Sequence, residues 1–255
     1  MQISIPLRSF AVRPIKWALR RTGRLVISQN IYGVDAFADI KRLSQAWQYP
    51  IEVFFDVGAN DGDTTIRARH NFESCRIFAF EPHPKTFRQL SRNTTKIPNV
   101  ELLNLALGSD GSERTMFEYN DNSKINSFLS DAQFTVRFRT DATKQIRVDC
   151  TTTDRFCSER GIKKIDVLKI DTEGFDLEVL KGATSMLARR AIKFIYFEFN
   201  DIAPRSGTSG GALMPIDQLI RPEGYRFIAT YNDYVVPEGE LFLVSNALYA
   251  LPPSR

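Results

Sequence analysis

The strongest constraint on the fold is an alternation of short apolar runs with helix-like segments from residue 51 onward. The predicted strands cover residues 51–57, 75–80, 100–106, 165–170 and 192–199. Helices are predicted between them near residues 63–72, 84–94, 154–160 and 174–189, where apolar residues recur at helical spacing. This alternation predicts a mostly parallel sheet with helices on both faces, joined by right-handed crossovers.

The C-terminal part departs from this alternation. A helix near residues 215–222 precedes two apolar runs, "YRFIATYNDYVV" and "ELFLVSNALYA", with a predicted turn at Pro237, Glu238 and Gly239. An antiparallel pair at the sheet edge therefore closes the predicted α/β fold, a Rossmann-like three-layer sandwich with a seven-stranded sheet. We also predict an irregular insertion or hairpin near residues 109–147, and a loop at residues 205–211.

The chain is long enough for one large core, with 255 residues of which 43% are hydrophobic. We predict one catalytic domain over residues 51–255, preceded by a basic helical extension over residues 1–50. Residues 1–25 contain six basic residues, no acidic residue and interleaved apolar side chains. One interpretation is a helix that packs on the domain with a solvated basic face, and the other is a peripheral membrane contact.

Charge, cysteine content and hydropathy restrict the class of protein further. The formal net charge of +4 is mild, so nucleic acid is not the predicted partner. Three cysteines without C-x-x-C spacing argue against a disulfide framework and favour a reducing compartment. No apolar run approaches the roughly 18–20 residues that span a bilayer, and a signal peptide pattern is not recognised. We therefore expect a cytoplasmic protein.

The first predicted strand ends in a glycine-containing turn, "DVGANDG", directly before a helix. Gly58 and Gly62 allow the backbone to approach a ligand at the carboxyl ends of the strands. The spacing does not match the G-x-G-x-x-G fingerprint of dinucleotide sites. Asp56, Asp61 and Asp63 would repel a pyrophosphate and suit a cationic ligand such as S-adenosylmethionine, which carries a sulfonium and an ammonium.

A second acidic residue, Glu81, ends the next predicted strand, 19 residues after Gly62. A carboxylate in this place can accept hydrogen bonds from both hydroxyls of a ribose. The alternative is that Glu81 only keeps the strand end soluble or caps the next helix. Together with the acidic turn, Glu81 predicts an adenosine-type site at two adjacent strand ends.

Four segments carry a resemblance to a known family: "FFDVGANDGDTT", "IFAFEPHPKTFRQL", "ALGSDG" and "IDVLKIDTEGFDLEVLKGA". Over roughly residues 51–200, the chain resembles the FkbM family of class I S-adenosylmethionine-dependent methyltransferases. The resemblance implies O-methylation of a sugar, glycan or natural-product-like acceptor. It also implies cofactor contacts at Asp56, Gly58, Asn60, Gly62, Glu81, Ala106, Leu107 and Gly108.

Methyl transfer to a hydroxyl is an in-line displacement that depends mainly on alignment, while the hydroxyl must also lose its proton. The candidate catalytic residues are Asp171, Glu173, Glu198 and His83. Asp171 is the first choice for the base, and the alternatives are that it caps the next helix or contacts the cofactor or a metal. We predict no metal site, although the oxygen ligands near Asp171 and Glu198, including Asn200 and Asp201, leave a magnesium interpretation open.

Three lysines near the fourth predicted strand, Lys163, Lys164 and Lys169, are predicted to form a solvated rim. Two other functions remain as alternatives. The basic N-terminus favours a nucleic-acid methyltransferase, whereas "IDTEG" lacks the Asn/Asp-Pro-Pro-aromatic pattern of base methylation. A catalytically inactive cofactor-binding scaffold would keep Gly58, Gly62 and Glu81.

Overall fold

The computed structural model describes residues 31–118, 126–128, 144–203, 211–236 and 242–253. The predicted basic helix at residues 1–25, the turn at residues 237–239 and residues 205–210 of the predicted loop lie outside these ranges. Within them, no helix combines the length and the apolar character needed to cross a membrane. The three cysteines, Cys75, Cys150 and Cys157, are buried and unpaired.

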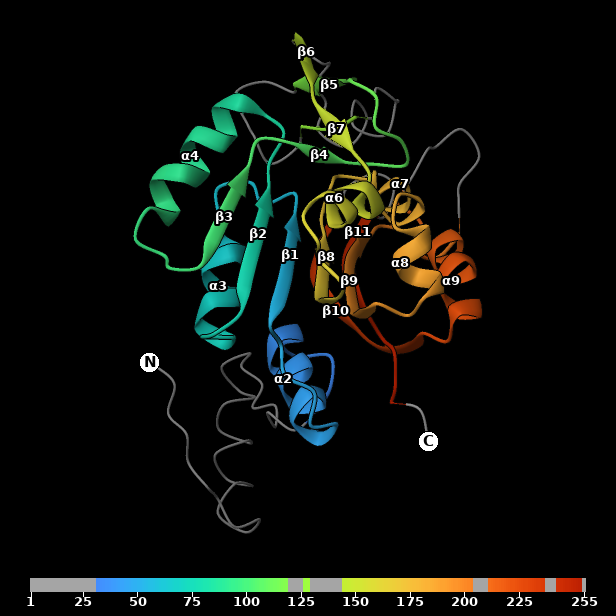
Figure 1. Cartoon of the computed structure of the whole chain (residues 1–255). Coiled ribbons are helices and arrows are strands. Elements are labelled where there is room, and N and C mark those ends of the chain that lie inside the picture. The colour runs from blue at the N-terminus through green and yellow to red at the C-terminus, as the bar shows by residue number, and fades with distance from the viewer. Residues whose placement is uncertain (1–30, 119–125, 129–143, 204–210, 237–241, 254–255) are drawn as a thin grey trace, which may run out of the picture.

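A seven-stranded sheet with the order β10-β11-β9-β8-β1-β2-β3 organises the domain (Figure 1). Its strands are β1 (Val53–Val57), β2 (Arg76–Phe80), β3 (Val100–Leu103), β8 (Ile165–Ile170), β9 (Ile192–Phe199), β10 (Arg226–Val236) and β11 (Phe242–Ala250). Strands β9, β8, β1, β2 and β3 of this sheet are parallel, whereas β11 is antiparallel to both β9 and β10. The predicted mostly parallel sheet with an antiparallel hairpin is confirmed, with β11 inserted between β9 and β10.

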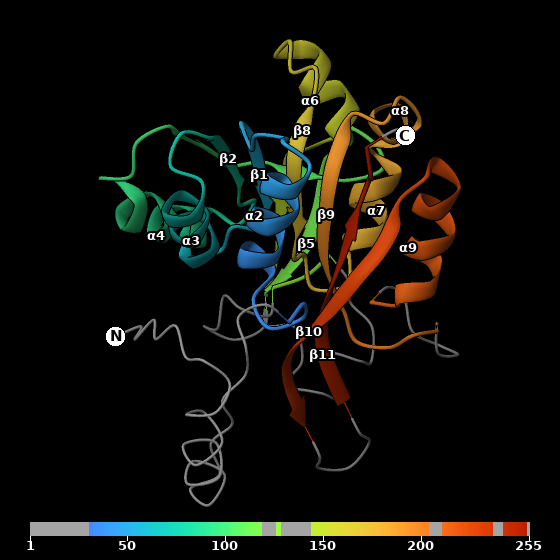
Figure 2. The same cartoon turned by 90° about the horizontal axis from the view of Figure 1, so that it is seen from below.

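Helices cover both faces of the sheet, as predicted (Figure 2). One face carries α2 (Ala36–Ala46), α3 (Asp63–Asn71) and α4 (Pro84–Thr94), and the other carries α6 (Thr153–Glu159), α7 (Asp176–Lys181), α8 (Thr184–Ala188) and α9 (Leu213–Ile220). A short 3-10 helix, η2 (Arg221–Glu223), follows α9. The layers follow from the alternation of side chains along each strand, since neighbouring residues point to opposite faces.

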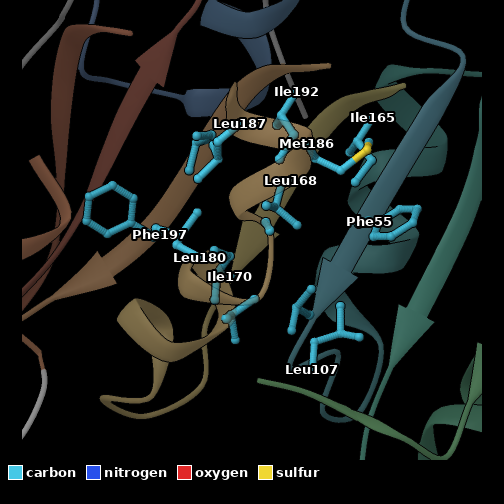
Figure 3. Close-up of a cluster of buried hydrophobic side chains, with 14 of the residues drawn as sticks. Phe55, Leu107, Ile165, Leu168, Ile170, Leu180, Met186, Leu187, Ile192 and Phe197 are labelled. Atoms are coloured by element: carbon cyan, nitrogen blue, oxygen red, sulfur yellow. The ribbon is translucent and has the colours of Figure 1, made fainter. Parts of the chain in front are cut away.

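The two faces hold separate hydrophobic clusters. Phe55 and Leu168 belong to the cluster beneath α6 to α9, which Figure 3 shows running from Ile165 at one end to Leu107 at the other. Phe54 belongs to the opposite cluster, where Phe37 of α2 stacks on it with ring centroids 5.9 Å apart. Helix α2 therefore shares the core of the sheet, although it lies within the predicted extension of residues 1–50.

The third predicted strand, residues 100–106, divides in the structure. β3 ends at Leu103, and β4 (Ala106–Leu107) leaves the main sheet to pair with β7 (Cys150–Thr151). β5 (Arg114–Glu118) and β6 (Lys144–Val148) form an antiparallel pair within the predicted insertion. Figure 1 shows these small sheets beyond the carboxyl ends of β1, β2 and β3.

The predicted helix at residues 174–189 breaks into α7 and α8 at Gly182 and Ala183. A Cβ atom on Gly182 would lie only 1.9 Å from the carbonyl oxygen of Gly108. Glycine therefore allows the chain to touch the end of β4, a contact between distant segments that helical periodicity cannot predict.

Candidate active site

The turn after β1 is held against the end of β2 by backbone hydrogen bonds. The amides of Gly58 and Ala59 donate to the carbonyl of Phe80 at 3.0 and 2.9 Å. The amide of Asn60 donates to Glu81 Oε2 at 3.0 Å. Three successive amides are thus engaged with β2 rather than directed at a phosphate, in agreement with the missing dinucleotide fingerprint.

Both glycines of this turn allow close packing. Gly58 has φ +74°, and a Cβ there would lie 1.8 Å from the carbonyl oxygen of Asp171. Gly62 has φ +99°, and its Cβ would lie 2.9 Å from a methyl of Thr94 and 3.0 Å from a methyl of Leu90. These contacts press the turn against β8 and α4, so packing alone accounts for both glycines, and their contact with a ligand stays a prediction.

Glu81 is buried at the end of β2 and is held by two backbone amides. Its Oε1 accepts from the amide of His83 at 2.9 Å and its Oε2 from that of Asn60. A carboxylate has about four lone-pair positions, so two remain after these hydrogen bonds. Burial raises the pKa of Glu81 to about 7, although the two amides and the charge of Lys169 oppose this. The arrangement fits a ligand that donates two hydroxyl hydrogen bonds.

His83 begins helix α4 as its N-cap. Its Nδ1 accepts from the amide of Thr86 at 3.3 Å, and its Nε2 lies 3.6 Å from a carboxylate oxygen of Glu118. Burial lowers the pKa of His83, although Glu118 opposes this shift. The neutral ring is the form that can accept at Nδ1, so these contacts explain His83 as a capping residue that also faces β5.

Asp171, directly after β8, has an accessible carboxylate. Its side chain is 39% exposed, whereas that of Asp56, also near Lys169, is fully buried. Helix α7 has Phe175 at its N-cap position and no side-chain capping bond, so the structure does not show the predicted alternative of a cap by Asp171. Asp171 therefore caps no helix, and its carboxylate is accessible to solvent.

Asp176, a buried carboxylate that is not among the predicted site residues, joins the ends of β8 and β9. Its Oδ2 accepts from the hydroxyl of Thr172 at 2.8 Å, and its Oδ1 from the amide of Glu198 at 3.3 Å. Burial, and then the charge of Asp171, raise the pKa of Asp176 to about 6. In sequence, Asp176 is indistinguishable from an ordinary acidic residue in the first turn of a helix.

The turn between β8 and α7 has two successive left-handed residues, Glu173 at φ 52° and Gly174 at φ 93°. A left-handed residue other than glycine costs roughly 1–3 kcal/mol and persists where its surroundings impose it. The buried Ser127 donates from Oγ to the carbonyl of Glu173 at 2.8 Å, and the ring of Phe128 lies 4.8 Å from that of Phe175. The insertion thereby contacts the turn that follows Asp171.

The prediction of a solvated lysine rim is wrong for Lys169. Its side chain is only 4% exposed, whereas Lys163 is exposed and Lys164 has a side chain 40% exposed. The Lys169 amine lies 3.0 Å from Asp56 Oδ1 and donates to the carbonyl of Gly58 at 3.0 Å. Lys169 is buried because all six residues of β8, a central strand, are buried.

The structure also places the cofactor contacts predicted on β4 and one of the oxygen ligands considered for magnesium. Ala106 and Leu107 are buried in β4, where backbone pairing with β7 holds them, and their contact with adenine stays a prediction. The amide of Asn200 donates to the carbonyl of Gly211 at 2.7 Å. Across the described ranges, no group of three histidine, cysteine, aspartate or glutamate residues is placed to hold a metal ion.

The strand order and the site together define a class of protein. The sheet has β11 antiparallel between two strands that run the other way, a glycine turn after β1 and an acidic residue after β2. This is the Rossmann-like fold of the class I methyltransferases. The chain belongs to the FkbM methyltransferase family, because the model of the methyltransferase FkbM domain matches residues 56–227, more than half of the chain.

Three curated relatives illustrate the family. The chain is 28% identical to the 2-O-methyltransferase NoeI of Sinorhizobium fredii over 60% of this chain and 65% of the relative. It is 29% identical to the hexuronic acid methyltransferase AglP of Haloferax volcanii over 58% and 56%, respectively. It is 27% identical to the 31-O-demethyl-FK506 methyltransferase FkbM of Streptomyces tacrolimicus over 71% and 75%. The matches thus span less than two thirds of the first two relatives.

Proposed function

We propose that this protein is an S-adenosylmethionine-dependent methyltransferase that methylates a hydroxyl oxygen of a sugar, glycan or natural-product-like acceptor. Family membership supports the reaction class. The acceptor class is supported by relatives whose names specify 2-O-methylation, a hexuronic acid and 31-O-demethyl-FK506. The single observation that carries the proposal is the accessible carboxylate of Asp171 beside the Gly58 turn.

The residues at the carboxyl ends of β1 and β2 fit the cofactor. Glu81 has two lone-pair positions left for the ribose hydroxyls after its two amide hydrogen bonds. Asp56, Glu81, Asp171 and Asp176 surround one buried lysine, so acidic groups exceed basic ones in this cluster. Such a cluster favours a ligand with positive charge. When bound, the cofactor would supply an electrophilic methyl group on its sulfonium sulfur.

Asp171 then acts as the general base. It accepts the proton of the acceptor hydroxyl while the oxygen forms its bond to the methyl carbon, and the electron pair of the broken carbon–sulfur bond stays on sulfur. A positioned carboxylate contributes about 10²–10⁴-fold to such a step. The rest of the acceleration comes from alignment of the oxygen with the methyl group, worth up to about 7–11 kcal/mol. Glu173, Glu198 and His83 remain proposed contributors on the acceptor side.

Calorimetry tests the cofactor assignment directly. Purified protein is titrated with S-adenosylmethionine, S-adenosylhomocysteine and, as a control, NAD, and the titrations are repeated with Glu81→Ala. We expect saturable binding of the two adenosyl ligands only, weakened by the substitution. Release of S-adenosylhomocysteine in the presence of uronic acids, sugars or natural-product alcohols then identifies the acceptor. Absence of adenosyl binding contradicts the proposal, and binding without transfer to any acceptor favours the inactive scaffold.

Binding of S-adenosylhomocysteine is expected to strengthen by about tenfold between pH 6 and pH 8. The pKa of Glu81 is raised to about 7, so the carboxylate that accepts from ribose hydroxyls is mostly protonated at pH 6 and mostly ionised at pH 8. Affinity therefore rises with pH through that interval and then levels off. Calorimetry at several pH values measures this, with Glu81→Gln as the control. An equally steep pH dependence in Glu81→Gln would assign the effect to another group.

A further inference from the structure

We propose that Lys169 is a positioning residue for methyl transfer. Its buried amine fixes the position of the turn at Gly58, assigned to the cofactor, relative to Asp171, the proposed general base. The inference rests on the proposed function and extends it to a residue at the centre of the sheet, which contacts neither the cofactor nor the acceptor in this role.

The geometry around the Lys169 amine supports this role. Lys169 lies beside Asp56 in the register of β8 and β1. Its amine lies 3.0 Å from Asp56 Oδ1, donates to the carbonyl of Gly58 at 3.0 Å and lies 3.6 Å from Asp171 Oδ2. The hydroxyl of Thr65 donates to the other oxygen of Asp56 at 2.6 Å, which orients that carboxylate toward β8. One amine thus connects the ends of β1 and β8 at the two groups assigned to cofactor and acceptor.

Stability alone does not explain a lysine at this position. Replacing a buried ion pair with apolar residues of similar volume is often neutral or stabilising. Val167, the residue of β8 that faces the same side of the sheet as Lys169, is a fully buried apolar residue, so an apolar side chain suits this face of the strand. Burial by itself lowers the pKa of Lys169, but Asp56 and Asp171 outweigh it and raise the pKa, so the amine stays charged. What the charged amine adds is a hydrogen bond to the carbonyl of Gly58 and a positive charge beside Asp171.

The charges facing Asp171 show why a cation is needed there. Lys169 on β8 is its cationic neighbour, while Asp176 on α7 adds negative charge, as does Asp56 on β1 beyond the amine. Glu81, directly after β2, lies in the field of the same Lys169 and Asp56. An opposite charge within about 4–6 Å favours the ionised form of a carboxyl group. Removing Lys169 would leave Asp171 facing the like charges of this cluster without its cationic neighbour.

The test compares Asp56→Asn with the double variant Asp56→Asn/Lys169→Met. Lys169→Met alone would leave Asp56 buried without its cation, a change that typically costs about 3–5 kcal/mol and endangers folding. In the Asp56→Asn background no charged Asp56 is left behind, and Asp171 remains 3.6 Å from the amine as its counter-charge, so the comparison shows what Lys169 does for Gly58 and Asp171. Thermal unfolding verifies that both variants fold, and Asp56→Asn/Lys169→Gln, whose amide can still donate, replaces the methionine variant if it does not.

Three measurements are made on each variant: affinity for S-adenosylhomocysteine, kcat for methyl transfer, and the pH profile of kcat. Relative to Asp56→Asn, we expect the double variant to show about tenfold lower kcat, severalfold weaker binding, and an acid limb moved up by about one pH unit. Equal affinity, kcat and acid limb in the two variants would overturn the inference. So would a lower thermal stability or affinity with an unmoved acid limb, because that result describes a purely structural lysine. Failure of the wild type to bind adenosyl ligands would instead refute the proposed function.

Discussion

Replacement of Asp171 by asparagine is expected to lower kcat by about 10²–10⁴-fold while leaving the affinity for S-adenosylmethionine within about twofold. Asparagine has nearly the shape of aspartate but cannot accept the proton of the acceptor hydroxyl. The side chain of Asp171 is 39% exposed and caps no helix, so the fold depends little on its charge. Steady-state kinetics with the identified acceptor, together with calorimetry for the cofactor, measure the two quantities separately.

The matched control for Asp171→Asn is Glu198→Gln. Glu198 lies on β9, the strand next to β8, and is half-buried. Its substitution also removes one negative charge from the same region and keeps the shape of the side chain. We expect a much smaller loss of kcat than for Asp171→Asn. If Glu198→Gln shows the larger loss, the base has been assigned to the wrong strand.

Replacement of Gly58 by alanine is expected to lower the free energy of unfolding by more than about 4 kcal/mol, a loss that marks exceptional damage for a single substitution. The new Cβ would lie 1.8 Å from the carbonyl oxygen of Asp171, so the turn after β1 and the end of β8 would have to separate. The φ of +74° adds a conformational penalty of roughly 1–2 kcal/mol for a residue with a side chain. Binding of S-adenosylhomocysteine should be lost as well, because the same movement displaces the cofactor turn.

Gly161→Ala provides the control that separates these two effects. Gly161 has φ +65°, close to that of Gly58, but a Cβ there would meet no atom within 4 Å. Its substitution should therefore cost only the conformational penalty, roughly 1–2 kcal/mol, with cofactor affinity unchanged. Urea denaturation of both variants measures the difference. Similar losses in the two would mean that backbone conformation, not the contact with Asp171, makes Gly58 necessary.

Much of the fold could be predicted because it depends on local patterns. The predicted strands at residues 165–170 and 192–199 and the helix at residues 84–94 have the same bounds in the structure. Each is a mainly apolar run or a regular periodic segment, for which burial and periodicity agree. The prediction was wrong at residues 174–189, because the break at Gly182 responds to a contact with Gly108.

The residues of the candidate site also divide into those that local sequence could predict and those that depend on distant contacts. Gly58 and Glu81 were recognisable because residues at the ends of neighbouring parallel strands meet at one edge of the sheet. Lys169 was predicted to be solvated, since a lysine in a strand gives no local sign of a buried carboxylate opposite it. Asp176 was not selected, because its contact with the amide of Glu198 crosses from α7 to β9.

The sequence by itself determined the layered α/β architecture, the glycine turn, the acidic strand ends and the resemblance to the FkbM family, since each is written in a short continuous stretch. Only the tertiary structure decided which charged groups are buried and which are accessible. Asp56 and Lys169 face each other across β1 and β8, 113 residues apart in the chain, while Asp171 stays accessible. The physical reason is that the ionisation and accessibility of a group depend on burial and on neighbouring charges, and strand pairing between distant segments establishes both.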